Sequence, residues 1–155
     1  MSKTRSEIAM DKFTEGYNCA QSVALAFADL TDMDEAMLAS CASSFGGGIG
    51  RLREVCGCVS GMAMILGLLC GYDDPKAVEE KAKHYERVQT VAHRFEEMNG
   101  SMVCRELLGL SAGHDEPTPE ARTEAYYKKR PCKELVGMAA TILDEYLIKE
   151  GITGK

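Results

Sequence analysis

The chain has 155 residues, of which 45% are hydrophobic, and its formal net charge is −6. A chain of this length forms one ordinary domain that buries about two-thirds of its unfolded surface, so disulfides are not required for its stability. The negative charge, with basic residues scattered among acids, argues against binding to a nucleic acid or an acidic membrane, since those partners call for clustered Lys and Arg.

Two helices are predicted at the start of the chain. Thr4-x-x-Glu7 is a capping box that opens a helix ending at Gly16. Asn18 is placed to cap a second helix, which runs to about Leu30 and has Cys19 as its first residue. The apolar residues at helical spacing in this second helix are expected on its buried face: Ala20, Val23, Phe27 and Leu30.

A third helix and a glycine-rich loop follow. Asp32-x-x-Glu35 opens this helix, and the loop Gly46-Gly47-Gly48-Ile49-Gly50-Arg51 ends it. Because the loop stands directly before another helix, its backbone N–H groups and Arg51 are suited to hold a small anion. The residues expected to face inward on the third helix are Met33, Met37, Leu38, Cys41 and Phe45.

Residues 55–72 include no charged side chain, and a run of eighteen such residues is at the lower limit for a membrane span. Four glycines dilute its apolar character, charged residues flank it tightly, and the other helices are amphipathic and need a partner. We therefore predict no membrane span. Instead, we expect a buried, glycine-rich central helix that begins near Glu54 and has Cys56 and Cys58 in its opening turn.

Three further helices are predicted before the last one. Asp74-Pro75 starts a long helix that Asn99-Gly100 closes, and Ser101 caps a short helix with Cys104 at its third position. Thr118-Pro119 begins a modest helix. The apolar stripe expected on the long helix consists of Val78, Ala82, Tyr85, Val88, Val91, Ala92, Phe95 and Met98.

Pro131 is well placed as the first residue of the last helix, which puts Cys132 in its first turn. The sequence shows no strand alternation, repeat or linker. We therefore predict an all-α fold, a helical bundle that forms a single domain over residues 1–155. The residues expected on the buried face of the last helix are Leu135, Val136, Ala139, Ile142, Leu143, Tyr146 and Leu147.

The chain contains seven cysteines, and its N-terminal residues show neither an apolar signal segment nor twin arginines. A cytoplasmic location is therefore expected, where cysteines are more often catalytic, metal-binding or inert than paired in a disulfide framework. Cys41 lies within a predicted helix and Cys70 at the end of one, so both are interpreted as core residues.

The other cysteines are distinguished by their position, because four of them fall in the first turn of a predicted helix. A helix start favours a thiolate through unpaired N–H groups and the positive end of the helix dipole, by about 0.3–1 kcal/mol. Nearby basic side chains deepen this effect if they point inward. These four cysteines are Cys19, Cys56, Cys104 and Cys132, and the basic residues near them are Arg51, Arg53, Arg105, Arg130 and Lys133.

Three motifs carry a resemblance to a known family: Gly16-Tyr17-Asn18-Cys19-Ala20-Gln21-Ser22, the glycine-rich loop, and Cys56-Gly57-Cys58-Val59-Ser60-Gly61. With Cys104 and Cys132, they resemble the prokaryotic family of redox-active proteins named for its cysteine pattern, C_GCAxxG_C_C. The resemblance maps the recurring cysteines of that family to Cys19, Cys56, Cys104 and Cys132. At Cys58 the family usually has alanine, so this chain departs from the pattern there.

The resemblance implies a redox centre built on those four cysteines, and two versions of it are open. In the first, the four sulfurs, with Cys58 as a further candidate, ligate an iron–sulfur cluster or another thiolate-bound metal. In the second, Cys56 attacks a disulfide or a peroxide-type substrate, and Cys19, Cys104 or Cys132 resolves the product. Four thiolates repel one another, so their convergence would require a metal or oxidation to disulfides.

The alternative is a module without chemistry of its own, which binds a metal, a small anion or a protein partner. Its supporting feature is the glycine-rich loop, with Gly46, Gly47, Gly48, Gly50 and Arg51 as the expected binding residues. A redox version implies a redox partner protein, and exposed apolar faces would allow a homodimer. Three histidines, His84, His93 and His114, show no paired metal spacing and are expected to be ordinary.

Overall fold

Capping side chains define the first two helices. The structure, a computed structural model, describes residues 2–111 and 114–154. Helix α1 is Arg5–Glu15 and begins with the predicted reciprocal cap at Thr4. Helix α2 is Cys19–Leu25, and Asn18 caps it as predicted, with Gln21 completing a reciprocal cap that was not predicted. Helix α1 ends at Gly16 as predicted. Helix α2 is shorter than predicted, because a separate 3₁₀ turn (η1, Ala28–Leu30) forms the remainder.

Helix α3, Glu35–Ala42, differs from its prediction in start and in buried face. The side chain of Asp34, not Asp32, accepts the capping hydrogen bond, from the N–H of Met37. Leu38 is buried, but Met37 is 55% exposed and Cys41 is also exposed. The inward placement of Met37 and Cys41 was therefore wrong. The reason is that α3 packs against α2 and the short turn η2 (Ser43–Phe45), which cover only a narrow face.

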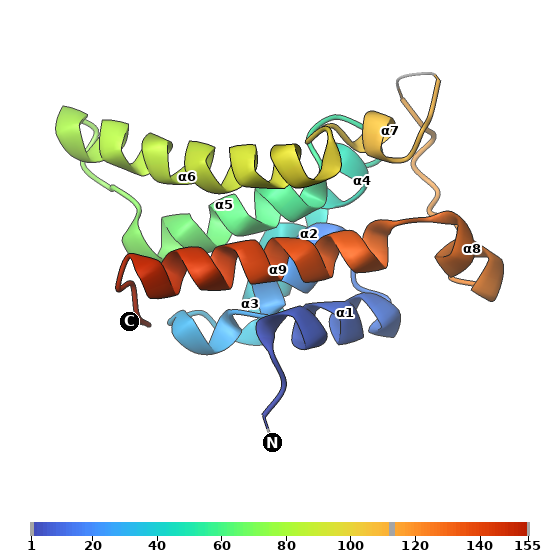
Figure 1. Ribbon diagram of the computed structural model, residues 1–155, viewed down its shortest axis with the longest axis horizontal. Helices are drawn as coiled ribbons and strands as arrows, with labels where there is room; N and C mark the ends of the chain where they lie inside the picture. The colour runs from blue at the N-terminus through green and yellow to red at the C-terminus, as the bar shows by residue number, and fades with distance from the viewer. Residues whose placement is uncertain (1, 112–113, 155) are drawn as a thin grey trace.

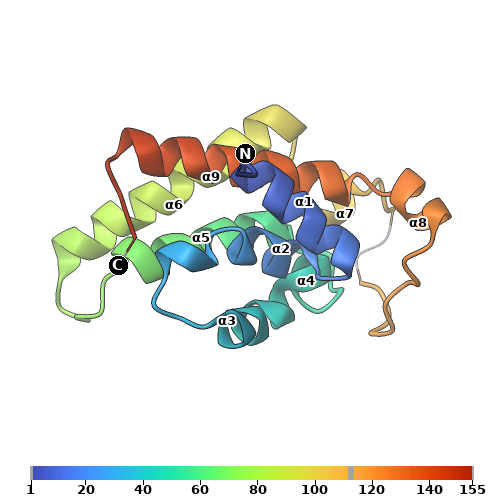
Figure 2. The ribbon, with the colours of Figure 1, turned by 90° about the horizontal axis from the view of Figure 1, so that it is seen from below.

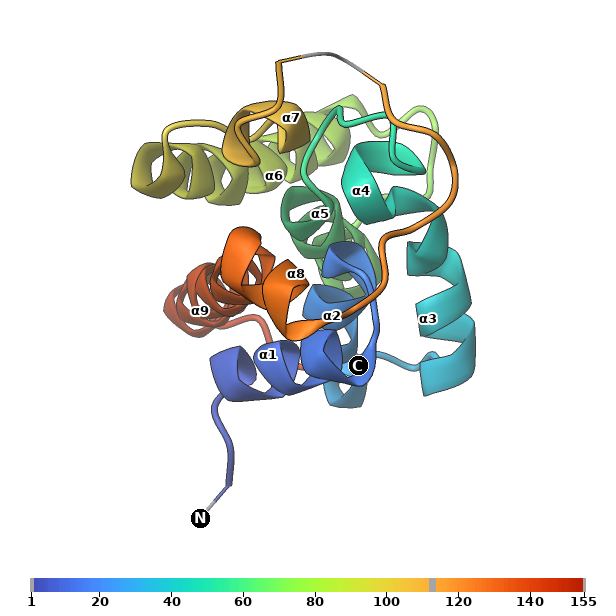
Figure 3. The same ribbon diagram turned by 90° about the vertical axis from the view of Figure 1, so that its right-hand side faces the viewer.

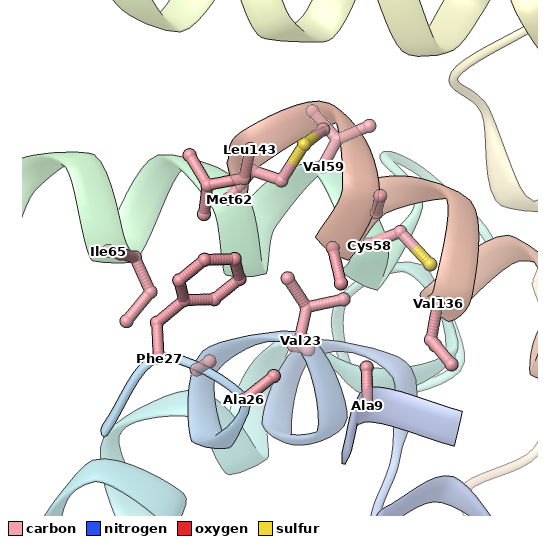
Figure 4. Packing of buried hydrophobic residues seen from close by; sticks show 14 of the residues in the cluster. Ala9, Val23, Ala26, Phe27, Cys58, Val59, Met62, Ile65, Val136 and Leu143 are labelled. Atoms are coloured by element: carbon pink, nitrogen blue, oxygen red, sulfur yellow. The ribbon is translucent and has the colours of Figure 1, made fainter. Parts of the chain in front are cut away.

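Helix α5, Gly57–Cys70, is the buried, glycine-rich central helix that the sequence predicted. It packs against α2 along one side, and a Cβ added at Gly61 would lie 2.9 Å from the carbonyl oxygen of Ala20. Only glycine permits this close approach of two backbones. Figure 4 shows Met62 and Ile65 of α5 facing Val23 and Phe27 from α2 and its end. In the described part of the chain, no helix combines the length and apolar character needed to cross a bilayer.

Helix α6, Val78–Asn99, begins three residues after the predicted Asp-Pro start and ends at Gly100 as predicted. Its second half carries the buried residues Val91, Ala92 and Phe95. Val78 is 73% exposed, and Tyr85 and Met98 are about half exposed, so the full-length stripe was wrong. The reason is that α6 lies on the surface of α5 and α9 and is covered on one side only (Figure 1).

The last three helices carry two of the cysteines. Helix α7, Cys104–Leu107, begins at Cys104 itself rather than two residues earlier, because Ser101 accepts a hydrogen bond from the Val103 N–H instead of capping the helix. Helix α8, Glu124–Lys129, is capped by Thr123, five residues later than predicted. Helix α9, Cys132–Lys149, follows Pro131 directly. Of its predicted inward residues, only Tyr146 is not buried.

Helix α9 packs against α1, α2, α5 and α6 and so joins the two sides of the bundle (Figures 1 and 2). The prediction of an all-α bundle is confirmed. Helices α5 and α9 both start at the end of the bundle where α4 (Gly46–Ile49), α7 and α8 lie, which Figure 3 shows facing the viewer. The fold therefore gathers several helix starts at one end, which we call the cysteine end.

Candidate functional site

Four helix starts bring four cysteines to one cavity at the cysteine end. Cys19, Cys104 and Cys132 are the first residues of α2, α7 and α9, and Cys56 is the N-cap of α5. All four line a single cavity of about 60 Å³. These are the four cysteines that the sequence singled out. We call this space the cysteine cavity.

The chain segments that precede Cys56 and Cys104 pair with each other through backbone hydrogen bonds. Val55 and Val103 form an isolated antiparallel bridge. On either side of the bridge, the N–H of Cys56 donates to the carbonyl of Met102 at 2.8 Å, and the N–H of Cys104 donates to the carbonyl of Glu54 at 2.6 Å. Residues far apart in sequence are thereby held in register, so the starts of α5 and α7 are fixed relative to each other.

The glycine-rich loop supports this arrangement through an unusual backbone. Gly47, Gly48, Ile49, Gly50 and Arg51 all have positive φ, between +54° and +69°. This conformation costs a non-glycine residue roughly 1–2 kcal/mol, which explains why glycine dominates the segment. At Gly48 there is also no room, because an added Cβ would lie 2.7 Å from the Cβ of Cys104. The loop thus packs directly beneath Cys104.

The residues predicted to cradle an anion are divided between two spaces. Gly47 and Gly48 line the cysteine cavity, and Gly46, Gly47, Gly50 and Arg51 line a larger hollow beside it. However, the N–H of Gly50 donates to the carbonyl of Ser44 at 2.9 Å, and that of Arg51 to the carbonyl of Gly46. These two N–H groups are therefore occupied by the backbone itself.

The pKa of Cys19 is shifted in the opposite direction from the pKa values of the neighbouring Cys132 and Cys58. Hydrogen bonding from Cys132, then from Cys58, lowers the pKa of Cys19 well below its usual range, and the charges of Arg122 and Arg53 add to this effect. The pKa of Cys132 is raised by its hydrogen bond to Cys19 and by burial. Burial raises the pKa of Cys58, as do its hydrogen bonds to Cys19 and Cys56. Of these three thiols, Cys19 is therefore the one whose thiolate form is favoured.

Cys104 is a buried thiol with a cationic partner. Burial raises its pKa, and the Arg53 guanidinium opposes this effect. Nη1 of Arg53 donates to Sγ of Cys104 at 3.6 Å, while its Nε donates to the carboxylate of Asp115 at 2.8 Å. Arg53 is only 6% exposed, so Asp115 holds the guanidinium against the sulfur.

The basic residues near the cysteines take different places from one another. Arg53 reaches a sulfur as anticipated, while Arg51 and Arg130 line the adjoining hollow. Arg105 pairs with Glu54 at 3.5 Å.

Arg122, which was not predicted as a site residue, lines both spaces. Its guanidinium donates to the carbonyls of Phe13 and Tyr17 and lies 4.2 Å from the centre of the Phe13 ring. Tyr126, four residues further along the chain, lines the same two spaces. No local signal could have found Arg122, since it precedes α8 in a polar segment, and only the fold places it against the end of α1.

The remaining cysteines lie outside the cavity. Cys41 is exposed on α3, so its interpretation as a core residue was wrong. Cys70 is half-buried at the end of α5, where its thiol donates to the carbonyl of Leu66 at 3.2 Å. Cys58 is fully buried behind Cys19 in the hydrophobic core.

The histidines give no further donors to the cavity. His84 is buried beside Tyr72, and His114 is exposed and contacts Glu54 at 3.3 Å. Within residues 2–111 and 114–154, no group of three or more Cys, His, Asp or Glu side chains is arranged to hold a metal ion. The four cysteines are thus neighbours around a cavity and not a preformed metal-binding set.

Comparison with known proteins gives one match. A search of curated proteins and a search of solved structures find nothing that matches the chain. The model of one family, described as "putative redox-active protein (C_GCAxxG_C_C)", matches residues 17–146, a range that contains all four helix-start cysteines. The chain therefore belongs to the C_GCAxxG_C_C family of redox-active proteins.

Proposed function

We propose that the protein carries out thiol–disulfide exchange, with Cys19 as the attacking thiolate and Cys132 as the resolving thiol. The observation that carries this proposal is the convergence of four helix-start cysteines on one cavity, which Cys19 and Cys132 both line. A thiolate next to a protonated thiol is the pair that such exchange requires.

The exchange proceeds in two balanced steps. First, Sγ of Cys19 attacks one sulfur of a substrate disulfide, a mixed disulfide forms, and the other sulfur leaves as a thiolate. Second, Cys132 loses its proton and attacks Sγ of Cys19, which releases the second half of the substrate as a thiol. The substrate gains two electrons and two protons, one proton from Cys132 and one from solvent, and the protein is left with a disulfide between Cys19 and Cys132.

Cys19 fits the attacking role better than Cys56, which the sequence suggested. Cys19 is partly exposed, whereas Cys56 is 4% exposed and lies under the bridge between residues 55 and 103. The proximity of Cys19 to Arg122 and Arg53 also favours its charged form. The unpaired N–H groups at the helix starts favour the thiolate form of both Cys19 and Cys56.

Cys104 and Cys56 form the inner wall of the cavity in this scheme. Arg53 stands beside Cys104, so it can stabilise negative charge that develops on a departing sulfur. A dithiol electron donor must reduce the protein again after each cycle, which is the role we assign to a redox partner protein.

A thiolate-bound metal or iron–sulfur cluster is the second candidate. Four cysteines around one cavity favour it, since thiolates are the ligands of choice for iron–sulfur clusters and zinc. However, the described side chains do not form a metal-binding set as they stand, so binding would require them to move closer. Iron and zinc analysis of anaerobically purified protein, with a visible spectrum, decides this candidate directly.

The main proposal is tested by trapping its intermediate. We expect reduced wild-type protein treated with 2-hydroxyethyl disulfide to form an intrachain disulfide between Cys19 and Cys132. Cys132→Ser should stop at a mixed disulfide on Cys19, because the hydroxyl still donates a hydrogen bond but cannot resolve the intermediate. Mass spectrometry of the intact protein and its peptides distinguishes the two products.

Cys19→Ser and Cys41→Ser are the matched controls. Cys19→Ser should abolish both products, whereas Cys41→Ser should react like the wild type because Cys41 lies outside the cavity. If Cys132→Ser accumulates no adduct on Cys19, the assignment of the two roles is wrong. Unreactive, metal-free thiols throughout the cavity would instead favour a module without chemistry of its own.

A further inference from the structure

A second, larger space opens beside the cysteine cavity. It has a volume of about 370 Å³ and shares Arg53, Arg122 and Cys132 with the cavity. Its walls include four guanidinium groups, from Arg51, Arg53, Arg122 and Arg130. We call it the arginine hollow.

The hollow is positively charged although the chain as a whole is negative. Two carboxylates accompany the four guanidiniums: Asp115 pairs with Arg51 and Arg53, and Glu120 pairs with Arg130. Glu120 lines the hollow, too. In the described part of the chain, no carboxylate pairs with Arg122, whose partners are two carbonyls and aromatic rings. The hollow therefore carries an excess of positive charge, although the net charge of the whole chain is −6.

The cations are held in place rather than free in solvent. The side chains of Arg53 and Arg130 are each 8% exposed, and that of Arg51 is 17% exposed. The Nε of Arg51 donates to the carbonyl of Glu116 at 2.9 Å. Fixed, partly desolvated guanidiniums attract an anion more strongly than mobile surface charges do.

The two spaces differ in size in a way that assigns their roles. The cysteine cavity has the volume of about two water molecules, so it admits little more than a reacting sulfur. The arginine hollow is within the range of roughly 300–1,000 Å³ that small-molecule sites occupy. Leu108, Pro117, Pro119 and Tyr126 add apolar wall to it, which suits a short carbon skeleton.

We propose that the arginine hollow selects a small disulfide that carries carboxylate groups, and presents its sulfur to Cys19. This inference rests on the proposed function and adds its substrate class. The Cys19 Sγ–S bond forms as the S–S bond of the substrate breaks, and the departing anionic thiolate takes up a proton on its return to solvent. The oxidised protein is again reduced by a dithiol donor.

The test compares disulfides that differ in charge. Reduced protein is mixed at low ionic strength with 3,3′-dithiodipropionate, 2-hydroxyethyl disulfide or cystamine, which are anionic, neutral and cationic. We expect the anionic probe to oxidise Cys19 at least about tenfold faster than the neutral one, relative to their rates with a small thiol, and cystamine to be slowest. Added salt should reduce this preference.

Arginine variants locate the source of the preference. In the double variant Arg51→Gln/Arg130→Gln, the ratio of the anionic to the neutral rate should fall to within about threefold of unity, because two guanidiniums of the hollow are lost. Arg94→Gln is the control, since it removes one positive charge from α6, where Arg94 pairs with Glu145. That variant should keep the wild-type ratio.

The outcomes separate the two proposals. If Cys19 reacts with the neutral probe but shows no preference for the anionic one, the substrate class is wrong and the exchange function stands. If Cys19 reacts with none of the three probes, the exchange function itself fails. A preference that survives in the double variant would contradict the role of the arginine hollow.

Discussion

The two ends of the helical bundle use cysteine in different ways. At the cysteine end, Cys19, Cys56, Cys104 and Cys132 stand at helix starts around one cavity, with arginines beside them. Toward the other end of α5, Cys70 closes the helix and donates to a carbonyl one turn back. The contrast shows that the chemical role of a thiol depends on its position at a helix start, close to other such thiols, more than on the number of cysteines.

Helix α5 runs between these two environments, and its glycines give the largest contrast. Gly61→Ala should lower the free energy of unfolding by about 2 kcal/mol, because the new Cβ would press on Ala20 and Val23. Gly67→Ala should raise it by roughly 0.5–1 kcal/mol, because that position has open space and alanine favours helix. Urea unfolding of both variants measures the difference. Equal effects would mean that α2 and α5 do not approach as closely as described.

The second test concerns the thiolate at the cysteine end. Cys132→Ala removes the hydrogen bond that contributes most to the low pKa of Cys19, so that pKa should rise. Alkylation of Cys19 by iodoacetamide at pH 6 should then slow, by about tenfold for each unit by which the new pKa exceeds 6. Cys132→Ser keeps a donor and should retain most of the wild-type rate. Peptide mapping by mass spectrometry measures the alkylation of Cys19 alone. Equal rates in both variants would show that a hydrogen bond from residue 132 does not stabilise the Cys19 thiolate.

The third test uses Cys58, the fully buried thiol behind Cys19. Burial raises the pKa of this thiol, so its contribution to stability is complete below the unfolded pKa of about 8.5 and declines as the pH rises above it. Above that pH, the wild type should lose stability faster than Cys58→Ala, and the difference in slope should approach about 1.4 kcal/mol per pH unit. Chemical unfolding of the reduced proteins between about pH 8.5 and 9.5 checks the slope. Parallel curves would show that Cys58 titrates normally.

The smallest effect is expected at Cys41, away from the cavity. Cys41→Ser should change the free energy of unfolding by less than about 0.5 kcal/mol, because the side chain is exposed. Thermal unfolding gives the value. A loss of stability above about 1 kcal/mol would show that Cys41 is buried in the core, as the helical pattern alone had predicted.

Much of the fold could be predicted because its signals are local. Thr4 and Asn18 cap the helices that their sequence motifs announce, and the run of uncharged residues between Cys56 and Cys70 forms the buried central helix. The errors arose where two local signals competed. Asp32 and Asp34 are both able to cap α3, and only the folded backbone selects Asp34.

The extent of burial along α6 could not be predicted from the sequence, for a related reason. A periodic stripe shows which face of a helix is apolar, but not how much of its length a partner covers. Val78 lies on that face and is 73% exposed, whereas Phe95 is fully buried.

Local sequence signals were enough to predict that helices form, where most of them begin, and that four cysteines occupy helix starts, since these features depend on neighbours within a few residues. The meeting of the four cysteines, the lowered pKa of Cys19 and the position of Arg122 at the same cavity depend on the packing of the whole chain. The physical reason is that cavities, pKa shifts and ion pairs depend on distances across the fold, which are set by packing contacts between residues far apart in sequence.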